Sequence, residues 1–398
     1  MKKIRVGILF GGRSGEHEVS LLSAASVLKA IDRSKYELVP IGITKEGRWV
    51  TAGHAERLLG GGEPERHLRA GDPDATQPAA VLRRGESVLV PPMPSEALVP
   101  FERGASEAGI TGPEHVLSVD VIFPVLHGTF GEDGTIQGLF ELAGMAYVGS
   151  GVLGSAAGMD KDAMKRLFQS AKLPMVKWVT FLRGEWEQSP KKIRARIEAA
   201  LKYPVFVKPA NLGSSVGITK AHDAKELPAA IETAAQFDRK IVVEQGVGGK
   251  KGKARELEVA VLGNDAPEAS VVGEVVPGKE FYDYEAKYLS EGSDLIVPAK
   301  LTKAETKRVR EMAVAAFRAC DCAGLARVDF LVEPGRAGSG KSAKIYVNEI
   351  NTLPGFTSIS MYPRLWAASG VPYPKLIDRL IELAIERRAD KDRNKYSL

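Results

Sequence analysis

The first fifty residues alternate between apolar strands and an amphipathic helix. Residues 4–10 form an apolar run typical of a buried strand, and glycines then open a turn. From Val19 onward, apolar residues recur at the spacing of one helix face. A second strand is predicted over Glu37–Ile43, with a hairpin around Gly47. Strand, helix and strand at this spacing form the βαβ unit of a parallel sheet, so the sequence predicts an α/β fold.

The remainder of the chain continues this alternation, with three exceptions. Residues 51–118 are rich in glycine, proline and charge, so we interpret much of this stretch as an inserted loop region. The uncharged stretch from Leu142 to Met159 contains five glycines and two serines, which favours strand and loop over a membrane span. The polar end, 386–398, is expected to be frayed. The other predicted elements are strands at Val119–Leu126, Tyr203–Val207, Ile241–Glu244 and Val259–Leu262, helices at Thr135–Leu142, from Lys161 and at Lys303–Cys320, and a hairpin of Leu325–Glu333 with Ala343–Gly355.

The amino-acid composition of the chain is that of an ordinary globular protein, and its net charge disfavours a nucleic-acid partner. A length of 398 residues predicts two or three domains, and 44% hydrophobic with 26% charged residues excludes wholesale disorder. A net charge of +5 is too small for this length to predict nucleic-acid binding. Cys320 and Cys322 have the spacing of neither a disulfide framework nor a usual zinc pair, so we expect a reducing compartment. The apolar run Val6–Phe10 is too short for a signal peptide, and we expect a cytoplasmic protein.

Polar side chains interrupt the two apolar strands of the late hairpin. Residues two apart share one face of a strand, so Arg327 lies with Asp329, and Glu349 lies with Asn351. Carboxylates and an amide carbonyl are hard oxygen ligands that suit magnesium, which also keeps waters and ligand phosphates. The alternative is an edge strand with a solvated polar face, but lysines mark the connecting loop as the solvated part. The hairpin therefore predicts a metal site.

A strand that ends in Lys208 leads into the glycine- and serine-rich loop NLGSSVG. The backbone N–H groups of such a loop can approach phosphate oxygens closely, and the lysine adds a positive charge. The segment is not a Walker A motif, since no Gly-Lys-Ser/Thr follows the loop. Such a loop is most often only a turn, but its lysine and the predicted metal site together favour phosphate binding.

The glycine-rich loop after the first strand, GGRSGEHEVS, lacks the spacing of a dinucleotide fingerprint. The second strand also has no acidic residue at its end, which disfavours a nicotinamide dehydrogenase. Glu16 lies where the loop enters the helix, either as a helix-start residue that the dipole stabilises or as a partner for a substrate ammonium. His127 follows a buried strand and is either a hydrogen-bonded structural residue or a site residue.

Taken together, these motifs resemble those of the D-alanine–D-alanine ligase family of the ATP-grasp superfamily. The resemblance covers the chain outside 51–118 and the loop near 334–344. The motifs follow the family order, and so many in one order exclude a chance match. They are GGRSGEHEVS, LHGTFGEDGTIQG, MDK, FVKPANLGSSVGI, RELEVAVLG, YDYEAKY, RVDF and NEINTLPGFTSIS.

The resemblance implies a three-domain ATP-grasp architecture, with ATP held between the second and third domains. The N-terminal parallel-sheet domain would span 1–150, with the insertion at 51–118. The central ATP-grasp subdomain would span 151–246. The C-terminal subdomain, 247–398, would carry the metal site and a closing loop at 278–296.

The resemblance also implies a reaction and its participants. In the family, one D-alanine carboxylate receives the γ-phosphoryl group of ATP, and the amine of a second D-alanine attacks the acyl phosphate, for peptidoglycan precursor synthesis. This implies ATP as co-substrate, two Mg²⁺ or Mn²⁺ ions per site, no nucleic-acid or membrane partner, and a homodimer. Catalysis of this kind depends mainly on positioning and on stabilising the charge that develops.

Individual catalytic and substrate-binding roles follow from the matched motifs. Arg327 and the Gly355 N–H would stabilise the oxyanion. Glu16 would bind the ammonium of the first D-alanine, with His127 nearby. The other residues of this set are Ser360 and the Met361 N–H, for the second carboxylate, and Ser214 with Tyr288, which together with Glu16 would hold the closing loop over the site.

Nucleotide and metal roles follow in the same way. Lys161 and Lys208 would contact the ATP phosphates, and Lys287 the γ-phosphate. The remaining implied contacts are Glu244, the Val247 backbone and Phe281 for adenine, Glu256 for the ribose hydroxyls, and Asp329, Glu349 and Asn351 for the two metal ions, with Glu349 bridging.

Two rival functions and two departures from the family pattern accompany this hypothesis. A D-alanine–D-lactate ligase is the nearest rival, and Tyr288 favours the dipeptide enzyme. A non-catalytic nucleotide sensor on the same fold would not need both the metal ligands and the oxyanion cation.

Gln245 and Gly246 stand where family members often have lysine and a bulky residue, which leaves the adenine contacts open. Met361 stands where leucine is common, but its contact is through the backbone.

Overall fold

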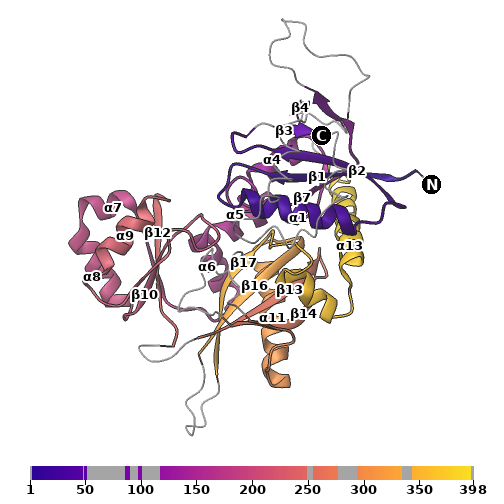
Figure 1. Cartoon of the computed structure of the whole chain (residues 1–398). Helices are drawn as coiled ribbons and strands as arrows, with labels where there is room; N and C mark the ends of the chain where they lie inside the picture. Colours follow the sequence, from indigo (N-terminus) through magenta and orange to yellow (C-terminus); the bar gives the residue numbers. More distant parts are fainter. Residues whose placement is uncertain are drawn as a thin grey trace, which may run out of the picture.

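The computed structural model of the chain contains three β-sheets with helices packed against them (Figure 1). Strands and helices alternate along the sequence, so the predicted α/β class is confirmed. Among the described residues, no helix is both long enough and apolar enough to cross a lipid bilayer. The structure describes residues 2–47, 49–51, 86–89, 97–100, 117–248, 254–276, 294–333 and 343–395.

The first sheet has a parallel centre and an antiparallel extension. From one edge to the other its described strands are β6 (Leu117–Ser118), β5 (Ala97–Pro100), β4 (Glu86–Leu89), β3 (Trp49–Thr51), β2 (Tyr36–Ile43), β1 (Ile4–Gly11), β7 (Val121–Pro124) and β8 (Ala146–Tyr147). Strands β2, β1, β7 and β8 are parallel, whereas β3 to β6 are added as antiparallel neighbours. The interpretation of 51–118 as loop is therefore wrong for the short strands in this stretch. These strands extend the sheet from β3, whose outer edge the β2–β3 hairpin would otherwise leave unpaired. The rest of that stretch lies outside the described residues.

The carboxyl ends of β1 and β7 lie side by side, where Leu9 pairs with Pro124. The loop after β1 enters α1 (His17–Ala30), which packs its buried face on the sheet. The Ser20 hydroxyl of α1 accepts a hydrogen bond from the Gly11 N–H and so fixes the turn between strand and helix. Ligands of open parallel sheets bind beyond the carboxyl ends of the strands. This edge therefore brings the loops that carry Glu16 and His127 together.

Helix α4 (Thr135–Leu142) has the predicted bounds, but the uncharged stretch after it differs from the prediction. Beyond β8 the chain forms α5 (Val152–Met159) and then α6 (Lys161–Ser170). The strand-and-loop interpretation is therefore wrong for the second half of this stretch. Its glycines serve close packing, since a Cβ on Gly154 would lie only 2.5 Å from the Asp321 carbonyl oxygen.

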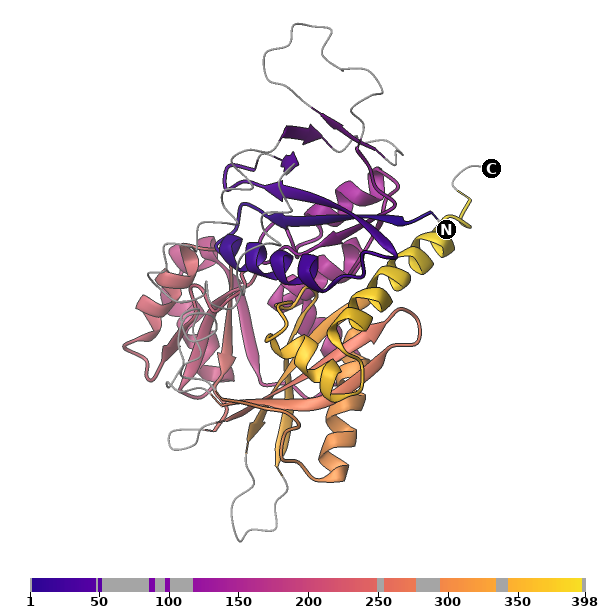
Figure 2. The same cartoon turned by 45° about the vertical axis from the view of Figure 1, so that its right-hand side comes forward.

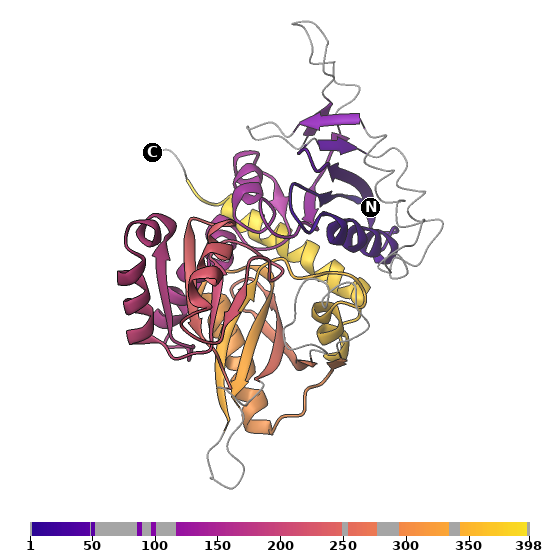
Figure 3. The ribbon, with the colours of Figure 1, turned by 60° about the vertical axis from the view of Figure 1, so that its left-hand side comes forward.

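The second sheet is a four-stranded antiparallel sheet of the described residues between 178 and 245. Its strands run in the order β11 (Thr219–Ala221), β10 (Val205–Pro209), β12 (Lys240–Gln245) and β9 (Trp178–Leu182). Buried residues such as Ile197 and Ile231 form one core with strand residues such as Val207. The helices α7 (Arg183–Gln188), α8 (Pro190–Ala200) and α9 (Leu227–Ala235) flank the sheet, which lies beside the third sheet in Figure 3.

The third sheet is antiparallel and contains the predicted hairpin. Its described strands run in the order β15 (Asp294–Ile296), β14 (Glu268–Val276), β13 (Arg255–Gly263), β16 (Gly324–Glu333) and β17 (Lys344–Asn351). Ala326, Val328 and Phe330 are buried in the core with α11 (Lys303–Ala319), so the predicted alternation of faces in β16 is confirmed. Met164 of α6 belongs to the same core, so elements on both sides of the predicted 246 boundary pack together. The three-domain division stays a prediction.

The chain ends with α12 (Met361–Ala368) and α13 (Tyr373–Lys391). Figure 2 shows α13 running from the third sheet toward the first sheet. There Arg387 donates to the Tyr147 carbonyl at 3.1 Å and lies over the Tyr147 ring, and Lys391 pairs with Glu141. The prediction of a frayed end from 386 onward is therefore wrong up to Lys391, because Arg387 has a partner on β8 and Lys391 has one on α4.

Candidate active site

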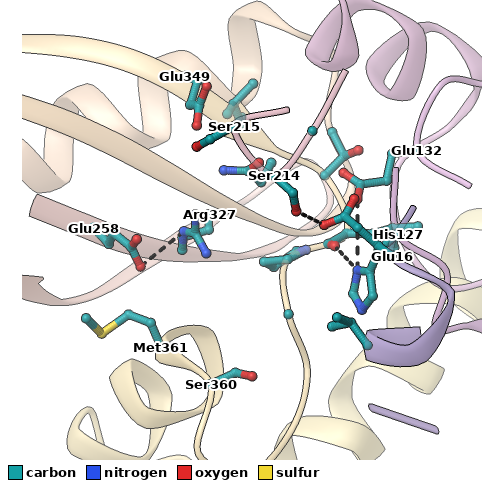
Figure 4. A pocket seen from close by; sticks show the side chains of 18 of the residues that line it. Glu16, His127, Glu132, Ser214, Ser215, Glu258, Arg327, Glu349, Ser360 and Met361 are labelled. Atoms are coloured by element: carbon teal, nitrogen blue, oxygen red, sulfur yellow. Dashed lines mark hydrogen bonds and ion pairs between the residues drawn. The ribbon is translucent and has the colours of Figure 1, made fainter. Parts of the chain in front are cut away.

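A cavity of about 260 Å³ lies where the three sheets meet, and side chains from each of them line it (Figure 4). The first sheet supplies the loops after β1 and β7, and the second supplies the glycine/serine loop after β10. The third supplies β13, β16 and β17, and the N-terminus of α12 completes the wall. The predicted residues that line the cavity are Glu16, His127, Lys161, Ser214, Arg327, Glu349, Asn351, Gly355, Ser360 and Met361.

The Glu16 carboxylate is held between two loops at the N-terminal end of α1. Ser214 donates a hydrogen bond from its hydroxyl to Glu16, so the predicted contact between these two residues is present. Glycine is favoured opposite, because Gly128 has a φ of 72° and a Cβ there would lie 2.7 Å from Glu16 Oε2. The carboxylate is 9% exposed and faces the cavity, which leaves it suited to a substrate ammonium.

Ser214 belongs to a loop with unusual backbone conformation. Ser214 and Ser215 have φ values of 49° and 59°, in the left-handed region that residues with side chains rarely adopt. Backbone strain of this kind concentrates at ligand-binding sites. The loop is fixed at its base, where the Asn211 N–H donates to Asp238 at 2.8 Å. It crosses from the second sheet to Glu16 on the first and so closes one side of the cavity.

His127 has hydrogen-bond partners on both ring nitrogens. Nδ1 lies 3.0 Å from the Leu353 carbonyl oxygen, which can only accept, so Nδ1 carries the proton. Nε2 then accepts from the Ser23 hydroxyl at 3.3 Å. Burial lowers the pKa of His127, which keeps the ring neutral. The imidazole therefore links the first sheet to the loop after β17 and also lines the cavity. His127 is thus both a hydrogen-bonded structural residue and a residue of the candidate site.

Glu132 faces His127 across the same corner, with its Oε1 3.9 Å from His127 Nδ1. The Gly128 N–H donates to this oxygen at 2.9 Å. Burial, followed by the nearby charge of Glu16, raises the pKa of Glu132 to about 8. Between pH 4.5 and 8, Glu132 is therefore protonated in the folded chain and ionised in the unfolded chain.

We therefore expect Glu132→Gln to remove part of the pH dependence of stability. Because the folded-state pKa is raised, the wild type should lose stability as pH rises from 4.5 to 8, whereas the glutamine variant cannot ionise there. The difference in melting temperature between variant and wild type should grow by about 2 °C or more from pH 5.5 to 8.5. Thermal unfolding in a pH series measures it, and a difference that stays constant would contradict the raised pKa.

Three carboxylates form a row across the third sheet, which we call the carboxylate row: Glu258, Asp329 and Glu349. Asp329 lies directly opposite Glu258 on β13 and opposite Glu349 on β17, so all three point to one face. Arg327 donates to both Asp329 oxygens at 2.7 Å, and its Nε lies 3.1 Å from Glu258. Asn351 donates its amide to Asp329 at 3.0 Å.

The end of the row at Asp329, Glu349 and Asn351 fits a magnesium or manganese ion in its chemistry. Asp329 and Glu349 lie directly opposite each other on β16 and β17, so an ion between them would contact both carboxylates. The donors are two carboxylates and an amide, which are hard oxygen ligands. In the described part of the chain, no three His, Cys, Asp or Glu side chains come together as a metal site, so any ion here also needs the amide, water or a ligand. These residues are chemically suited to a metal ion, and metal binding itself stays a prediction.

The N-terminus of α12 forms the opposite wall and suits a carboxylate. Ser360 precedes the first helical residue, Met361, whose N–H belongs to the first turn that lacks an intrahelical acceptor. Such N–H groups and the helix dipole favour anions. The Ser360 hydroxyl is held by the Thr357 N–H at 3.1 Å, and a Cβ on Gly355 would lie 3.3 Å from it. The oxyanion and carboxylate positions expected for Gly355 and Ser360 are therefore adjacent.

Lys161 and Lys208 occupy different environments. Lys161 is the first residue of α6, lines the cavity and donates to the Leu212 carbonyl at 2.7 Å. Asp160 caps this helix through two backbone N–H groups and pairs with Lys240 at 2.5 Å, which fixes the start of the helix. Lys208 does not line the cavity, and its ammonium lies 2.8 Å from Glu244.

A buried charge cluster of Lys208, Glu244 and Lys165 lies behind the glycine/serine loop. Glu244 is 2.8 Å from Lys208 and 3.2 Å from Lys165. Burial lowers the pKa of Lys208, but Glu244 and Glu349 outweigh it and the net pKa is raised, so Lys208 stays charged. Burial dominates at Lys165, whose pKa is lowered. The predicted phosphate lysine and the predicted adenine-side glutamate are thus direct partners.

We expect Lys208→Ala to weaken ATP use while folding is kept. The variant removes a positive charge beside the loop, which should raise the KM for ATP by about tenfold or more. Glu244 would keep only Lys165, so the melting temperature should also fall. Steady-state kinetics at varied ATP tests this, with Lys220→Ala on neighbouring β11 as the control. An unchanged KM for ATP would mean that NLGSSVG is only a turn.

Several predicted residues lie away from the cavity or outside the described chain. Asp329 contacts the cavity-lining Arg327 and Asn351 without lining the cavity itself. Val247 and Glu256 do not line it either. Phe281, Lys287 and Tyr288, with most of the predicted closing loop 278–296, lie outside the described residues, so their roles stay predictions.

Glu132 and Glu258 line the cavity but were not predicted as site residues, although the sequence carries a signal for each. Glu258 stands between Leu257 and Val259, so a carboxylate interrupts an apolar strand as in the RVDF motif. Glu132 lies in the glycine-rich loop after a parallel strand, where site residues of α/β folds gather. Neither pattern alone predicts that the side chain faces this cavity.

The three sheets, converging on a cavity lined by carboxylates, a guanidinium and a glycine/serine loop, are the architecture of the ATP-grasp enzymes. Two family models match the chain: the D-Ala–D-Ala ligase N-terminus over residues 5–150, and the D-Ala–D-Ala ligase C-terminus over residues 167–382. The chain belongs to the D-alanine–D-alanine ligase family.

Similar proteins cover the whole chain. The D-alanine–D-alanine ligase of Bacillus cytotoxicus is 46% identical over 399 residues, covering 100% of both chains. That of Ruminiclostridium cellulolyticum is 48% identical over 404 residues, covering 99% of this chain and 98% of the relative. Among solved structures, the D-alanine–D-alanine ligase from Coxiella burnetii has a TM-score of 0.77 at 34% identity, covering 98% and 97%. The VanG D-Ala:D-Ser ligase from Enterococcus faecalis has a TM-score of 0.78 at 36% identity, covering 96% and 100%.

Proposed function

We propose that this chain joins two D-alanine molecules into D-alanyl-D-alanine with the conversion of ATP to ADP and phosphate. The observation that carries the proposal is one cavity that Glu16, Arg327 and Ser360 line from three separate elements. A carboxylate suits a substrate ammonium, a guanidinium suits an oxyanion, and a helix N-terminus suits a substrate carboxylate. The family membership of the full chain supports the same reaction.

In the first step, a carboxylate oxygen of one D-alanine attacks the γ-phosphorus of ATP, and the bond to ADP breaks. Glu16 holds the ammonium of this D-alanine, and Ser214 fixes Glu16. Lys161 and the glycine/serine loop line the cavity, where the lysine and the backbone N–H groups of the loop would bind the phosphates. Phosphoryl transfer needs mainly such positioning and charge stabilisation. The product of this step is an acyl phosphate.

In the second step, the neutral amine of the other D-alanine attacks the acyl carbon. The tetrahedral intermediate carries a negative oxygen, which Arg327 and the Gly355 N–H stabilise. Arg327 is pre-oriented for this by two 2.7 Å bonds to Asp329, so little reorganisation is needed during the reaction. The carbon–oxygen bond to phosphate then breaks, and the amine passes one proton to the departing phosphate as it becomes the peptide nitrogen. Ser360 and the Met361 N–H hold the second carboxylate.

Asp329, Glu349 and Asn351 would hold the Mg²⁺ or Mn²⁺ ions. Such an ion, when bound, neutralises phosphate charge at the transferring group. Lys161, the glycine/serine loop and Arg327 line the same cavity, so positive groups and backbone N–H donors would surround the position proposed for the phosphates. Assembly as a homodimer is part of the proposal and rests on the family resemblance alone.

Phosphate release from ATP tests the proposal against its rivals. The assay compares D-alanine, D-lactate, D-serine, L-alanine and no amino acid, with mass spectrometry of the products. We expect release that depends on D-alanine and yields D-alanyl-D-alanine. D-Serine belongs in the panel because a solved relative is a D-Ala:D-Ser ligase. Release without any amino acid, or ATP binding without release, would contradict the proposal and favour a nucleotide-binding protein.

A further inference from the structure

Lys165 is a buried lysine to which the proposed reaction assigns no role. It belongs to α6, four residues and thus about one helical turn after Lys161. Lys161 lines the cavity, whereas Lys165 does not line it and is only 1% exposed. Lysine is almost never buried to this extent unless it is paired, so its partners indicate what it does.

Each oxygen of the Glu244 carboxylate has an ammonium partner from a different element. Lys165 Nζ, on α6, lies 3.2 Å from Oε1, and Lys208 Nζ, on β10, lies 2.8 Å from Oε2. Burial would raise the pKa of Glu244, but the charges of Lys165 and Lys208 outweigh it and lower this pKa to about 2. The carboxylate is therefore ionised at neutral pH, and it is shared by two lysines.

The position of Lys165 is set by the hairpin that carries the proposed metal ligands. The Ile350 N–H of β17 donates to the sulfur of Met164 at 3.3 Å, and Lys165 Nζ lies 3.5 Å from the Asn348 carbonyl oxygen. These contacts hold α6 against the third sheet, whereas Glu244 belongs to the second sheet. Lys165 therefore connects the metal hairpin to the partner of the phosphate lysine.

We propose that Lys165 is a positioning residue for ATP binding, which compensates Glu244 and so leaves the positive charge of Lys208 available to the ATP phosphates. This inference rests on the proposed function, with ATP as co-substrate and Lys208 as a phosphate contact. A buried carboxylate needs a compensating charge. Without Lys165, Glu244 and Lys208 would form a neutral pair, and the charge-assisted contact of Lys208 with a phosphate would weaken.

The test measures ATP binding directly, in two backgrounds. Lys165→Met keeps an unbranched side chain and removes the ammonium group. The Kd for ATP with magnesium is measured by titration calorimetry without D-alanine. We expect Lys165→Met to raise this Kd by about tenfold in the wild-type background. In the Glu244→Gln background the same change should alter it by less than about twofold, because no carboxylate is left to compensate. The KM for D-alanine should stay within about twofold throughout.

The comparison of backgrounds distinguishes positioning from other roles of Lys165. An equal rise of the Kd in both backgrounds would mean that Lys165 acts without Glu244, and would overturn the inference, as would an unchanged Kd in Lys165→Met. If Lys165→Met alone fails to fold, the double variant still buries no uncompensated carboxylate. Its Kd should then equal that of Glu244→Gln, and a difference of more than about twofold would overturn the inference.

Arg166→Met is the matched control, because it removes one positive charge at the next residue of α6. Arg166 pairs with Asp162 at 2.8 Å, has 67% of its side chain exposed and does not line the cavity. Its Kd for ATP should stay within about twofold of wild type, and a rise equal to that of Lys165→Met would overturn the inference. A wild-type chain that binds no ATP would contradict the proposed function instead.

Discussion

Glu349→Ala is expected to lower D-alanine-dependent phosphate release at least about a thousandfold, because metal stabilisation of a transferring phosphoryl group contributes several kcal/mol. Glu349 lines the cavity at the end of the carboxylate row that fits a magnesium ion, directly opposite Asp329. Removing it would leave only Asp329 and Asn351 of the three proposed metal ligands. Phosphate release in saturating magnesium measures the effect, and a rate near that of the wild type would refute the metal assignment.

The same variant separates catalysis from stability. Removing Glu349 relieves its repulsion of Asp329 but also removes a charge that stabilises the Lys208 ammonium, so the alanine variant should melt close to the melting temperature of the metal-free wild type. A structural role for Glu349 predicts a lower melting temperature instead. Glu333→Ala is the control, since Glu333 lies on the same hairpin, pairs with Lys344 at 3.3 Å and does not line the cavity. It should keep full activity.

Arg327→Lys is expected to lower kcat roughly 10²–10³-fold, the usual effect of removing an oxyanion donor. Lysine keeps the positive charge, so the carboxylate row is not left without a cation. A lysine ammonium is a point charge, however, and cannot reproduce the planar fork that bonds both oxygens of Asp329 and still faces the cavity. The KM for ATP should change by less than about threefold, because the role proposed for the guanidinium is on the intermediate rather than on the bound nucleotide.

Arg255→Lys provides a matched control for this prediction. Arg255 forms the same bidentate pair with Glu274, at 2.7 Å for both bonds, on the same sheet but away from the cavity. It should lose little kcat. Equal losses in both variants would mean that the guanidinium pairs only stabilise the sheet, and an unchanged kcat in Arg327→Lys would contradict the oxyanion role.

Local patterns in the sequence were sufficient to predict much of the fold and one wall of the site. The period of two in RVDF and NEIN places Arg327 with Asp329 and Glu349 with Asn351, and the hairpin has this arrangement. The β1–α1–β2 unit followed from hydrophobic spacing, because each element buries one face on its neighbours. These features depend on residues that are close in sequence.

Features that depend on distant partners could not be predicted in this way. The final helix is ordered through Lys391 because Glu141 lies beside it, 250 residues away in sequence. The row of Glu258 and Asp329 depends on the register between β13 and β16, which no local pattern sets. Likewise, Lys208 and Glu244 come from neighbouring strands and became ion-pair partners only in the folded sheet. The motif resemblance named Glu244 and Lys208 without this pairing.

The central claim, ligation through an acyl phosphate, is tested most directly by isotope transfer. D-Alanine labelled with oxygen-18 in its carboxylate is incubated with ATP and the enzyme, and the released phosphate is analysed by mass spectrometry. Because one carboxylate oxygen becomes bonded to phosphorus and leaves with it, each dipeptide formed should deliver one labelled oxygen to phosphate. Phosphate released without the label while dipeptide accumulates would contradict the account.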